Sequence, residues 1–157
     1  MTKIDRATPE DIYSVALNMR ERDFEEFTAV NMANTKEELA ESLSRHYGSL
    51  DCMIAVRRGD KAVAVGGALE IRPNVVSLMF MATDDFSKVA IDTTKYIRNQ
   101  LFPSLFNVGI HRIECASLVG YDYTHRWLKM LGMTREIGVM RAFGKNGEDF
   151  SMFAKVA

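Results

Sequence analysis

The chain alternates between segments with a two-residue hydrophobic period and segments with a helical one. Residues 4–7 alternate between apolar and polar and predict a short first strand. Thr8 then suits a helix N-cap and Pro9 a first helical position, with acidic residues behind them. We predict a helix that ends near Arg22, because apolar residues follow at helical spacing: Ile12, Val15, Ala16 and Met19.

A second helix is predicted after a capping box, in which Glu38 follows the N-cap candidate Thr35 by three residues. Gly48 suits the end of this helix, and its apolar stripe consists of Leu39, Leu43 and Tyr47. Between the two helices, residues 20–27 mix acidic, basic and aromatic side chains. Such a run is typical of a solvated loop or helix face.

Three strands are predicted in succession at residues 52–57, 62–71 and 75–82, separated by short turn signals. The short connections predict an antiparallel meander. The pair Gly66-Gly67 lies inside the second of these strands. Glycine within a strand often marks a bulge or a close approach of another backbone.

The second half of the sequence repeats the change from strand to helix. A long helix is predicted from about residue 86 to 101 or 106, then a strand at 111–117, which implies a right-handed parallel crossover from the strand before it. A further helix at about 123–131 is ended by Gly132. The last two strands, residues 136–143 and 150–156, flank a polar hairpin connection.

This element order, β-α-α-β-β-β-α-β-α-β-β, predicts an α/β (α+β) fold. We expect a mixed, mostly antiparallel sheet of about six or seven strands with about four helices. The whole length of 157 residues suits a single domain over residues 1–157.

Composition narrows the class of protein. The chain has 20 basic and 21 acidic residues, whereas a dedicated nucleic-acid binder is usually plainly basic. No apolar run is long enough to span a bilayer, and the first residues lack an apolar signal core. We therefore expect a cytoplasmic protein without nucleic-acid or membrane partners. Neither metal-ligand spacing nor a disulfide framework is present in the sequence.

The element order resembles that of the Gcn5-related N-acetyltransferase (GNAT) family over nearly the whole chain. Three local patterns add to it: residues 62–69 look like the family's third strand, residues 75–82 with the long helix like its acyl-CoA motif, and residues 127–133 like its late helix. A narrower similarity, from Gly120 onward, is to GNAT-like internal virion proteins of short-tailed bacteriophages. A phage origin would make the protein virion-associated.

The resemblance implies that acetyl-CoA is the co-substrate. The resemblance places the pantetheine of acetyl-CoA along strand backbone and its diphosphate at the start of the long helix. The family's loop there is rich in glycine and arginine, whereas this chain has Asp84 and Asp85 and no glycine. As the N-cap of the helix, Asp84 or Asp85 has a complete structural explanation. The cofactor-binding candidates are Met79, Phe80, Met81, Ala82, Thr83, Ser87, Lys88 and Tyr121.

The catalytic candidates also come from the resemblance. The family's usual tyrosine position falls on Leu128, which cannot donate a proton, so Tyr123 is the candidate acid and His125 a candidate base or substrate contact. Glu70 is a candidate base acting through water. The alternatives remain open: loop packing for the tyrosine, a solvated helix position for the histidine and an outward-facing surface position for the glutamate.

Two functions compete at this level. The first is N-acetyl transfer from acetyl-CoA to an amine on a small molecule or a protein. The second is a non-catalytic GNAT-like phage protein, a virion component or a binding protein with a degenerate acyl-CoA loop. Sheet edges also leave homodimer formation open.

Overall fold

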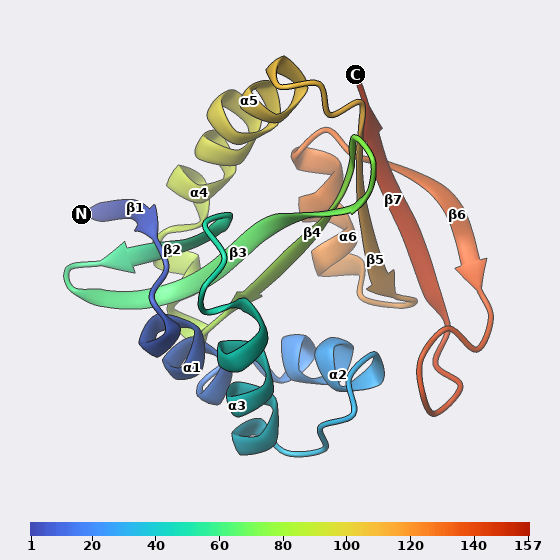
Figure 1. Cartoon of the computed structure of the whole chain (residues 1–157). Coiled ribbons are helices and arrows are strands. Elements are labelled where there is room, and N and C mark those ends of the chain that lie inside the picture. The colour runs from blue at the N-terminus through green and yellow to red at the C-terminus, as the bar shows by residue number, and fades with distance from the viewer. The chain divides into compact units, whose positions relative to one another are not determined.

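The computed structural model describes all 157 residues (Figure 1). Its elements, in chain order, are β1 (Thr2–Arg6), α1 (Pro9–Leu17), α2 (Glu21–Ala29), α3 (Lys36–Tyr47), β2 (Met53–Arg58), β3 (Lys61–Arg72), β4 (Val75–Ala82), η1 (Asp84–Lys88), α4 (Ala90–Tyr96), η2 (Ile97–Leu101), α5 (Phe102–Asn107), β5 (Arg112–Leu118), α6 (Asp122–Met130), β6 (Thr134–Met140) and β7 (Phe150–Val156).

The seven strands are hydrogen-bonded in the order β1-β2-β3-β4-β5-β7-β6, which confirms the predicted mixed sheet. β4 and β5 are parallel, as the crossover predicts, and β5 and β6 both pair with β7 in antiparallel register. The chain divides into two compact units, Met1–Gly67 with Met79–Ile91 and Ala68–Leu78 with Asp92–Ala157. The single-domain organisation stays a prediction.

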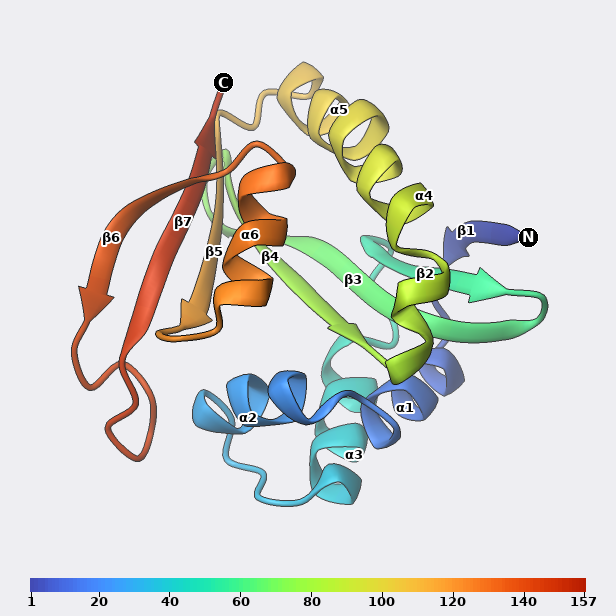
Figure 2. The ribbon, with the colours of Figure 1, turned by 180° about the vertical axis from the view of Figure 1, so that it is seen from behind.

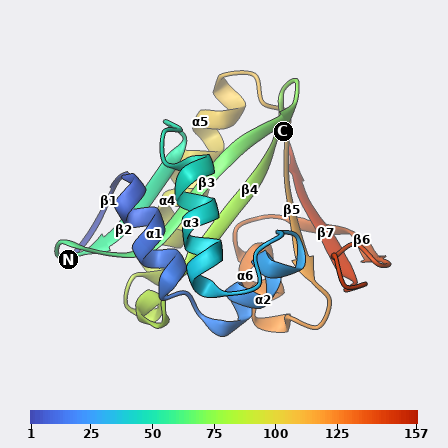
Figure 3. The same ribbon diagram turned by 60° about the horizontal axis from the view of Figure 1, so that its bottom comes forward.

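The first unit contains β1, β2 and the paired halves of β3 and β4, with α1 to α3. α1 and α3 lie side by side against the strands (Figure 3). Both begin where the sequence predicts, because Thr8 and Thr35 each accept a hydrogen bond from the third residue of the following helix. Their apolar stripes are buried in the core: Ile12, Val15, Leu39 and Leu43.

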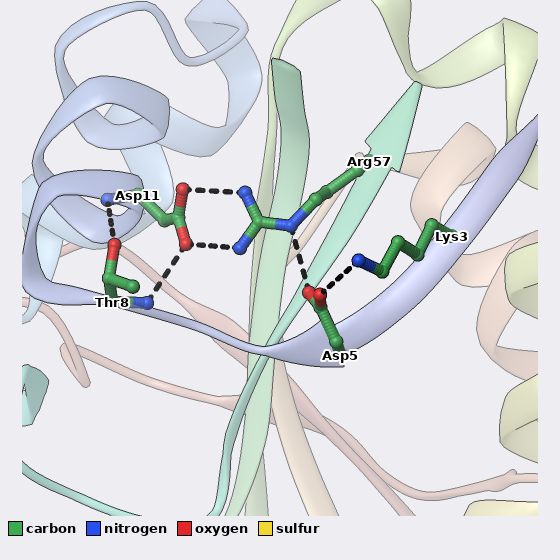
Figure 4. A network of polar contacts seen from close by, with 5 residues as sticks. All are labelled: Lys3, Asp5, Thr8, Asp11 and Arg57. Atoms are coloured by element: carbon green, nitrogen blue, oxygen red, sulfur yellow. Dashed lines mark hydrogen bonds and ion pairs between the residues drawn. The ribbon is translucent and has the colours of Figure 1, made fainter. Parts of the chain in front are cut away.

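A polar network ties β1, β2 and α1 together within this unit (Figure 4). Arg57 of β2 donates two hydrogen bonds to the carboxylate of Asp11, over 2.9 and 2.6 Å, and one to Asp5 over 2.8 Å. Asp11 also accepts from the backbone N of Thr8, which completes the cap of α1. One guanidinium therefore fixes a helix start and two strands at once.

The second unit is built on β5, β7 and β6, with α4 to α6. α6 packs along the strands (Figure 2), and Leu128 and Leu131 enter one apolar cluster with Ile113 of β5 and Phe153 of β7. Gly132 ends α6 with a φ of +94°, the left-handed conformation that favours glycine. The predicted final hairpin is confirmed.

Two helix predictions need correction. The first helix does not continue to Arg22 but ends at Leu17, and a separate helix α2 follows. The long helix is one winding segment in several parts: a 3₁₀ turn, an α-helix, a wider π turn over Ile97–Leu101 and a final α-helix. Pro103 lies two residues after the π turn, and proline can neither donate a backbone hydrogen bond to the preceding turn of a regular α-helix nor fit against it.

None of the helices combines the length and the apolar composition that a membrane-spanning helix requires.

Candidate functional site

In the first unit, hydrogen bonds anchor the end of β4 to the connection between α1 and α2. The backbone N of Arg20 donates to the carbonyl of Ala82 over 2.8 Å, and the Ala82 N donates to Oδ2 of Asp23 over 2.9 Å. Met19 and Thr83 form an antiparallel bridge beside this pair. Both polar backbone groups of Ala82, the last residue of β4, are therefore bonded within the unit.

Arg20 and Asp23 also form a buried ion pair. The guanidinium donates to both carboxylate oxygens, over 3.0 and 3.1 Å, and the two side chains are 12% and 6% exposed. The guanidinium lies 5.2 Å from the ring centroid of Phe86, in a cation–π arrangement. Burial raises the pKa of Asp23, and Arg20 and the Ala82 amide oppose that rise. Three hydrogen bonds thus hold one buried carboxylate.

Arg20 and Asp23 lie in the segment, residues 20–27, that the sequence predicts to be a solvated loop or helix face. That prediction is wrong for Asp23, which is buried, although the neighbouring Glu21 and Glu25 are exposed. The local signal is the spacing of three residues between Arg20 and Asp23, which suits an ion pair on a helix. Burial itself depends on Ala82, 59 residues farther along the chain, and no local pattern reports that contact.

The turn after β4 is closed by its own hydrogen bonds. Thr83, and not Asp84 or Asp85, is the N-cap of η1, and its hydroxyl accepts from the Asp85 N over 3.3 Å. The Thr83 N donates to the carbonyl of Val63 over 2.9 Å, and the Phe86 N donates to the carbonyl of Thr83 over 3.1 Å. The backbone amides of Thr83, Asp85 and Phe86 therefore already have acceptors within the unit.

The charges at this turn balance one another. Asp85 lies between two lysines, with Lys88 Nζ 3.0 Å from one carboxylate oxygen and Lys61 Nζ 3.5 Å from the other. The hydrogen bond from Lys88 lowers the pKa of Asp85, and Lys61 lowers it further. Asp84 is exposed. Asp85 therefore makes both ion pairs of the turn, and both are open to solvent.

The strand candidates carried over from the resemblance all lie in the first unit: Met79, Phe80, Met81 and Ala82. Phe80 is half-buried, and its ring meets that of Phe86 edge-on at 5.2 Å. A Cβ on Gly66 would lie 2.8 Å from the carbonyl oxygen of Met79. The predicted close backbone approach at Gly66 is confirmed. Of the other three candidates of this unit, Thr83 is buried, whereas Ser87 and Lys88 are exposed at the turn.

A second group of candidates lies in the second unit, where β5 ends and α6 begins (Figure 2). Tyr121 is the N-cap residue of α6 and is half-buried, whereas Tyr123, in the first turn, is 54% exposed. Leu128, on which the family's tyrosine position falls by the resemblance, is buried in the apolar cluster. Tyr123 is therefore the most exposed of these residues.

His125 is buried, with 6% of its surface exposed, so the expectation of a solvated helix position is wrong. Its ring lies 4.9 Å from that of Phe153, centroid to centroid. Burial lowers the pKa of His125, and a hydrogen bond with the backbone of Leu118 opposes that shift. Its Nε2 atom is buried and has no hydrogen-bond partner. The ring therefore contributes to the interior of the unit and does not present a nitrogen to solvent.

Two glutamates of the second unit also have structural partners. Glu70 is exposed and accepts a hydrogen bond from the Asn74 N over 3.2 Å, which caps the turn between β3 and β4. Glu114 is buried and pairs with Arg72 over 2.6 Å and with Arg112 over 2.8 Å. Burial alone would raise the pKa of Glu114, but the two arginines outweigh it and lower that pKa.

Comparison by sequence and by structure gives different results. No protein-family model and no curated protein matches the sequence. By structure, a GNAT-family acetyltransferase from Bacillus anthracis matches with a TM-score of 0.74 at 14% identity, over 99% of this chain and 94% of that one.

Two further solved structures agree. The ribosomal-protein-alanine N-acetyltransferase of Brucella melitensis matches with a TM-score of 0.73 at 13% identity, over 99% of both chains. The GNAT superfamily phosphinothricin acetyltransferase of Sinorhizobium meliloti, solved with acetyl-CoA, gives 0.73 at 15% identity, over 99% of this chain and 88% of that one. This chain therefore has the fold of the GNAT acetyltransferases.

Proposed function

We propose that this chain transfers an acetyl group from acetyl-CoA to an amine, either of a small molecule or of a protein. The observation that carries the proposal is the GNAT fold over 99% of the chain, shared with an enzyme solved in complex with acetyl-CoA. A shared fold alone does not establish an activity. The proposal therefore depends on whether the chain's own residues suit the donor.

The diphosphate of acetyl-CoA needs positive charge and hydrogen-bond donors. The amides of Thr83, Asp85 and Phe86 are already used, so backbone groups of this turn do not form an open cradle. The side chains do offer suitable chemistry, since Lys61 and Lys88 bring two ammonium groups to the turn and Ser87 is an exposed hydroxyl. On this proposal these side chains hold the anion in place of Asp85.

Acetyl-CoA, when bound, supplies the thioester that the amine attacks. Of the residues considered for proton transfer, Tyr123 is exposed and carries a phenol that can donate a proton to a leaving thiolate. Glu70 is exposed and its carboxylate can accept a proton through water. We assign His125 no contact with substrate because its ring is buried.

Binding is tested first, by the melting temperature of the protein with increasing acetyl-CoA. A ligand at 100 times its Kd stabilises a protein by about 2.7 kcal/mol, so we expect a clear rise. Acetylation of a panel of amines is then followed by release of free CoA thiol, and Tyr123→Phe should lower turnover without lowering the melting temperature. An unchanged melting temperature at millimolar acetyl-CoA would contradict the proposal.

A second function has its own support: a GNAT-fold protein that binds a partner, for example within a phage particle, and does not acetylate. The closed turn favours it, because Asp85 occupies both lysines and Leu128 replaces the family's tyrosine. Isothermal titration with CoA, combined with the assay of acetyl transfer, separates the two functions. Binding of CoA without any acetyl transfer, or no binding at all, would favour the second one.

A further inference from the structure

His125 occupies a position in the second unit that acetyl transfer does not use. It is the fourth residue of α6, and its ring packs against Phe153 of β7 at 4.9 Å. Only 6% of the residue is exposed. A histidine this deeply buried has a charge state that the fold must accommodate, because its ordinary pKa lies near neutrality.

The two ring nitrogens have different surroundings. The ring is hydrogen-bonded to the backbone of Leu118, the last residue of β5. Nε2 has no partner, so this bond is made by Nδ1, which must carry the proton because a carbonyl can only accept. The Leu118 carbonyl also accepts from the Tyr121 N over 3.3 Å, and the His125 N donates to the Tyr121 carbonyl over 3.0 Å. The neutral ring thus fastens the start of α6 to the end of β5.

The charges around the ring do not favour a second proton. Asp122 and Lys129 of α6 and Arg135 of β6 act on it, and two of these three groups are positive. β5 contributes the backbone of Leu118 and β7 the uncharged ring of Phe153. A proton on Nε2 would therefore place a charge in the interior with no acceptor, which is costly.

We propose that His125 is an acid-sensitive latch: the neutral ring holds the start of α6 against the end of β5, and a proton on Nε2 releases this connection. The direction follows from linkage. Burial lowers the pKa of His125 below its ordinary value of 6.5 in the folded state, so the released state takes up the proton first. Stability is complete above that value and falls as the pH decreases towards the lowered pKa of the folded state.

The size of the expected change in the release equilibrium follows from the uptake of one proton. Between pH 6.5 and the lowered pKa, the equilibrium constant for release increases by up to about tenfold for each pH unit. Hydrogen exchange of the full chain at pH 7.5 and 5.5, corrected for intrinsic exchange, measures it directly. We expect faster exchange at pH 5.5 for the amides of Tyr121 and His125, which are bonded in this connection. Amides of β2 in the first unit should not change.

The variants separate titration from packing. His125→Asn keeps a donor close to the position of Nδ1 and cannot titrate, whereas His125→Phe loses the donor as well. Both should remove the extra pH dependence, and only the second should also weaken the connection at pH 7.5. The matched controls are His46→Gln and His111→Gln, because these are the chain's other two histidines and both are exposed.

The wild-type protein alone can overturn the proposal, so a variant that fails to fold does not prevent the test. Two-bond nitrogen–proton NMR spectra identify the tautomer and the titration of each of the three histidines. We expect His125 of the folded protein to remain neutral, with the proton on Nδ1, below pH 6.5, where exchange already accelerates. An Nε2–H tautomer, or titration near 6.5 without any change in exchange, would refute the latch.

Discussion

Each unit fixes the start of a helix to the last residue of a strand, but the two anchors use different chemistry. In the first unit, Arg20 and Asp23 join α2 to Ala82 through an ion pair and two further hydrogen bonds, and none of their buried side-chain nitrogen or oxygen atoms lacks a partner. In the second unit, one buried imidazole joins α6 to Leu118 and leaves Nε2 without one. We call the first anchor saturated and the second unsaturated. The stability of the saturated anchor should depend strongly on the Arg20–Asp23 ion pair, and that of the unsaturated anchor on the pH.

The largest effect is expected from breaking the saturated anchor. Arg20→Met leaves the carboxylate of Asp23 buried without its counter-ion, which should reduce the free energy of unfolding by about 3–5 kcal/mol. Urea unfolding at pH 7 measures it. The double variant Arg20→Met with Asp23→Leu is the control, since replacing both charges by apolar groups should recover much of the loss. An equal loss in both variants would contradict the role of the unpaired charge.

A second substitution in the first unit tests how much the ion pairs of Arg57 contribute to stability. Arg57→Met removes three hydrogen bonds to Asp5 and Asp11 and should cost about 2–3 kcal/mol, because the pair is only partly buried. Arg57→Lys is the matched control; it retains the charge but loses the two-pronged contact.

The pH dependence of this network separates it from the latch. The hydrogen bond from Arg57 lowers the pKa of Asp5. Burial alone would raise that of Asp11, but the bonds from Arg57 and Thr8 outweigh it and lower the pKa. A carboxyl group whose pKa is lowered in the folded state stabilises the protein at pH values above its unfolded pKa of 3.8. This stabilisation is lost as the pH falls below 3.8 towards the lowered pKa. The first unit should therefore remain intact at pH 5.5, where the second unit releases α6.

These anchors mark the limit of prediction from the sequence. The caps at Thr8 and Thr35 depend on residues within one helical turn, so their sequence signals were sufficient. The break at Leu17 and the start of α2 depend on Asp23 reaching Ala82, a contact between distant parts of the chain. The turn at residues 84–88 also depends on contacts between distant parts of the chain, because Lys61 and Val63 of another strand hold it.

The burial of His125 could have been predicted from the sequence. His125 and Leu128 are three residues apart and both buried, which is the spacing of one helix face. The general tendency of histidine towards the surface hid this signal. The π turn before Pro103 also had a local cause, although proline alone does not determine whether a helix stops or widens. The roles of the candidate site residues in catalysis stay predictions.

A smaller effect is expected in the second unit from backbone strain at a single residue. Ala142 has a φ of +53°, in the left-handed region that alanine disfavours. Ala142→Gly should stabilise the protein by about 0.5–1 kcal/mol, after allowance for the greater freedom of glycine in the unfolded chain. Asn74→Gly is the control, because Asn74 has a φ of 65° but asparagine tolerates it. Thermal unfolding of the two variants compares them, and equal shifts would exclude strain at Ala142.

The smallest effect concerns the exposed ion pairs at the turn after β4, which contrast with the buried pair beside them. If acetyl-CoA uses Lys61 and Lys88, it must displace Asp85, and this competition between exposed groups is weak. Asp85→Asn should then raise the affinity for CoA by roughly two- to fivefold, measured by calorimetric titration at low ionic strength. Asp84→Asn removes the same charge from a neighbouring exposed residue and reports the general electrostatic contribution. A larger gain from Asp85 than from Asp84 would support direct competition for the lysines, whereas equal gains would exclude it.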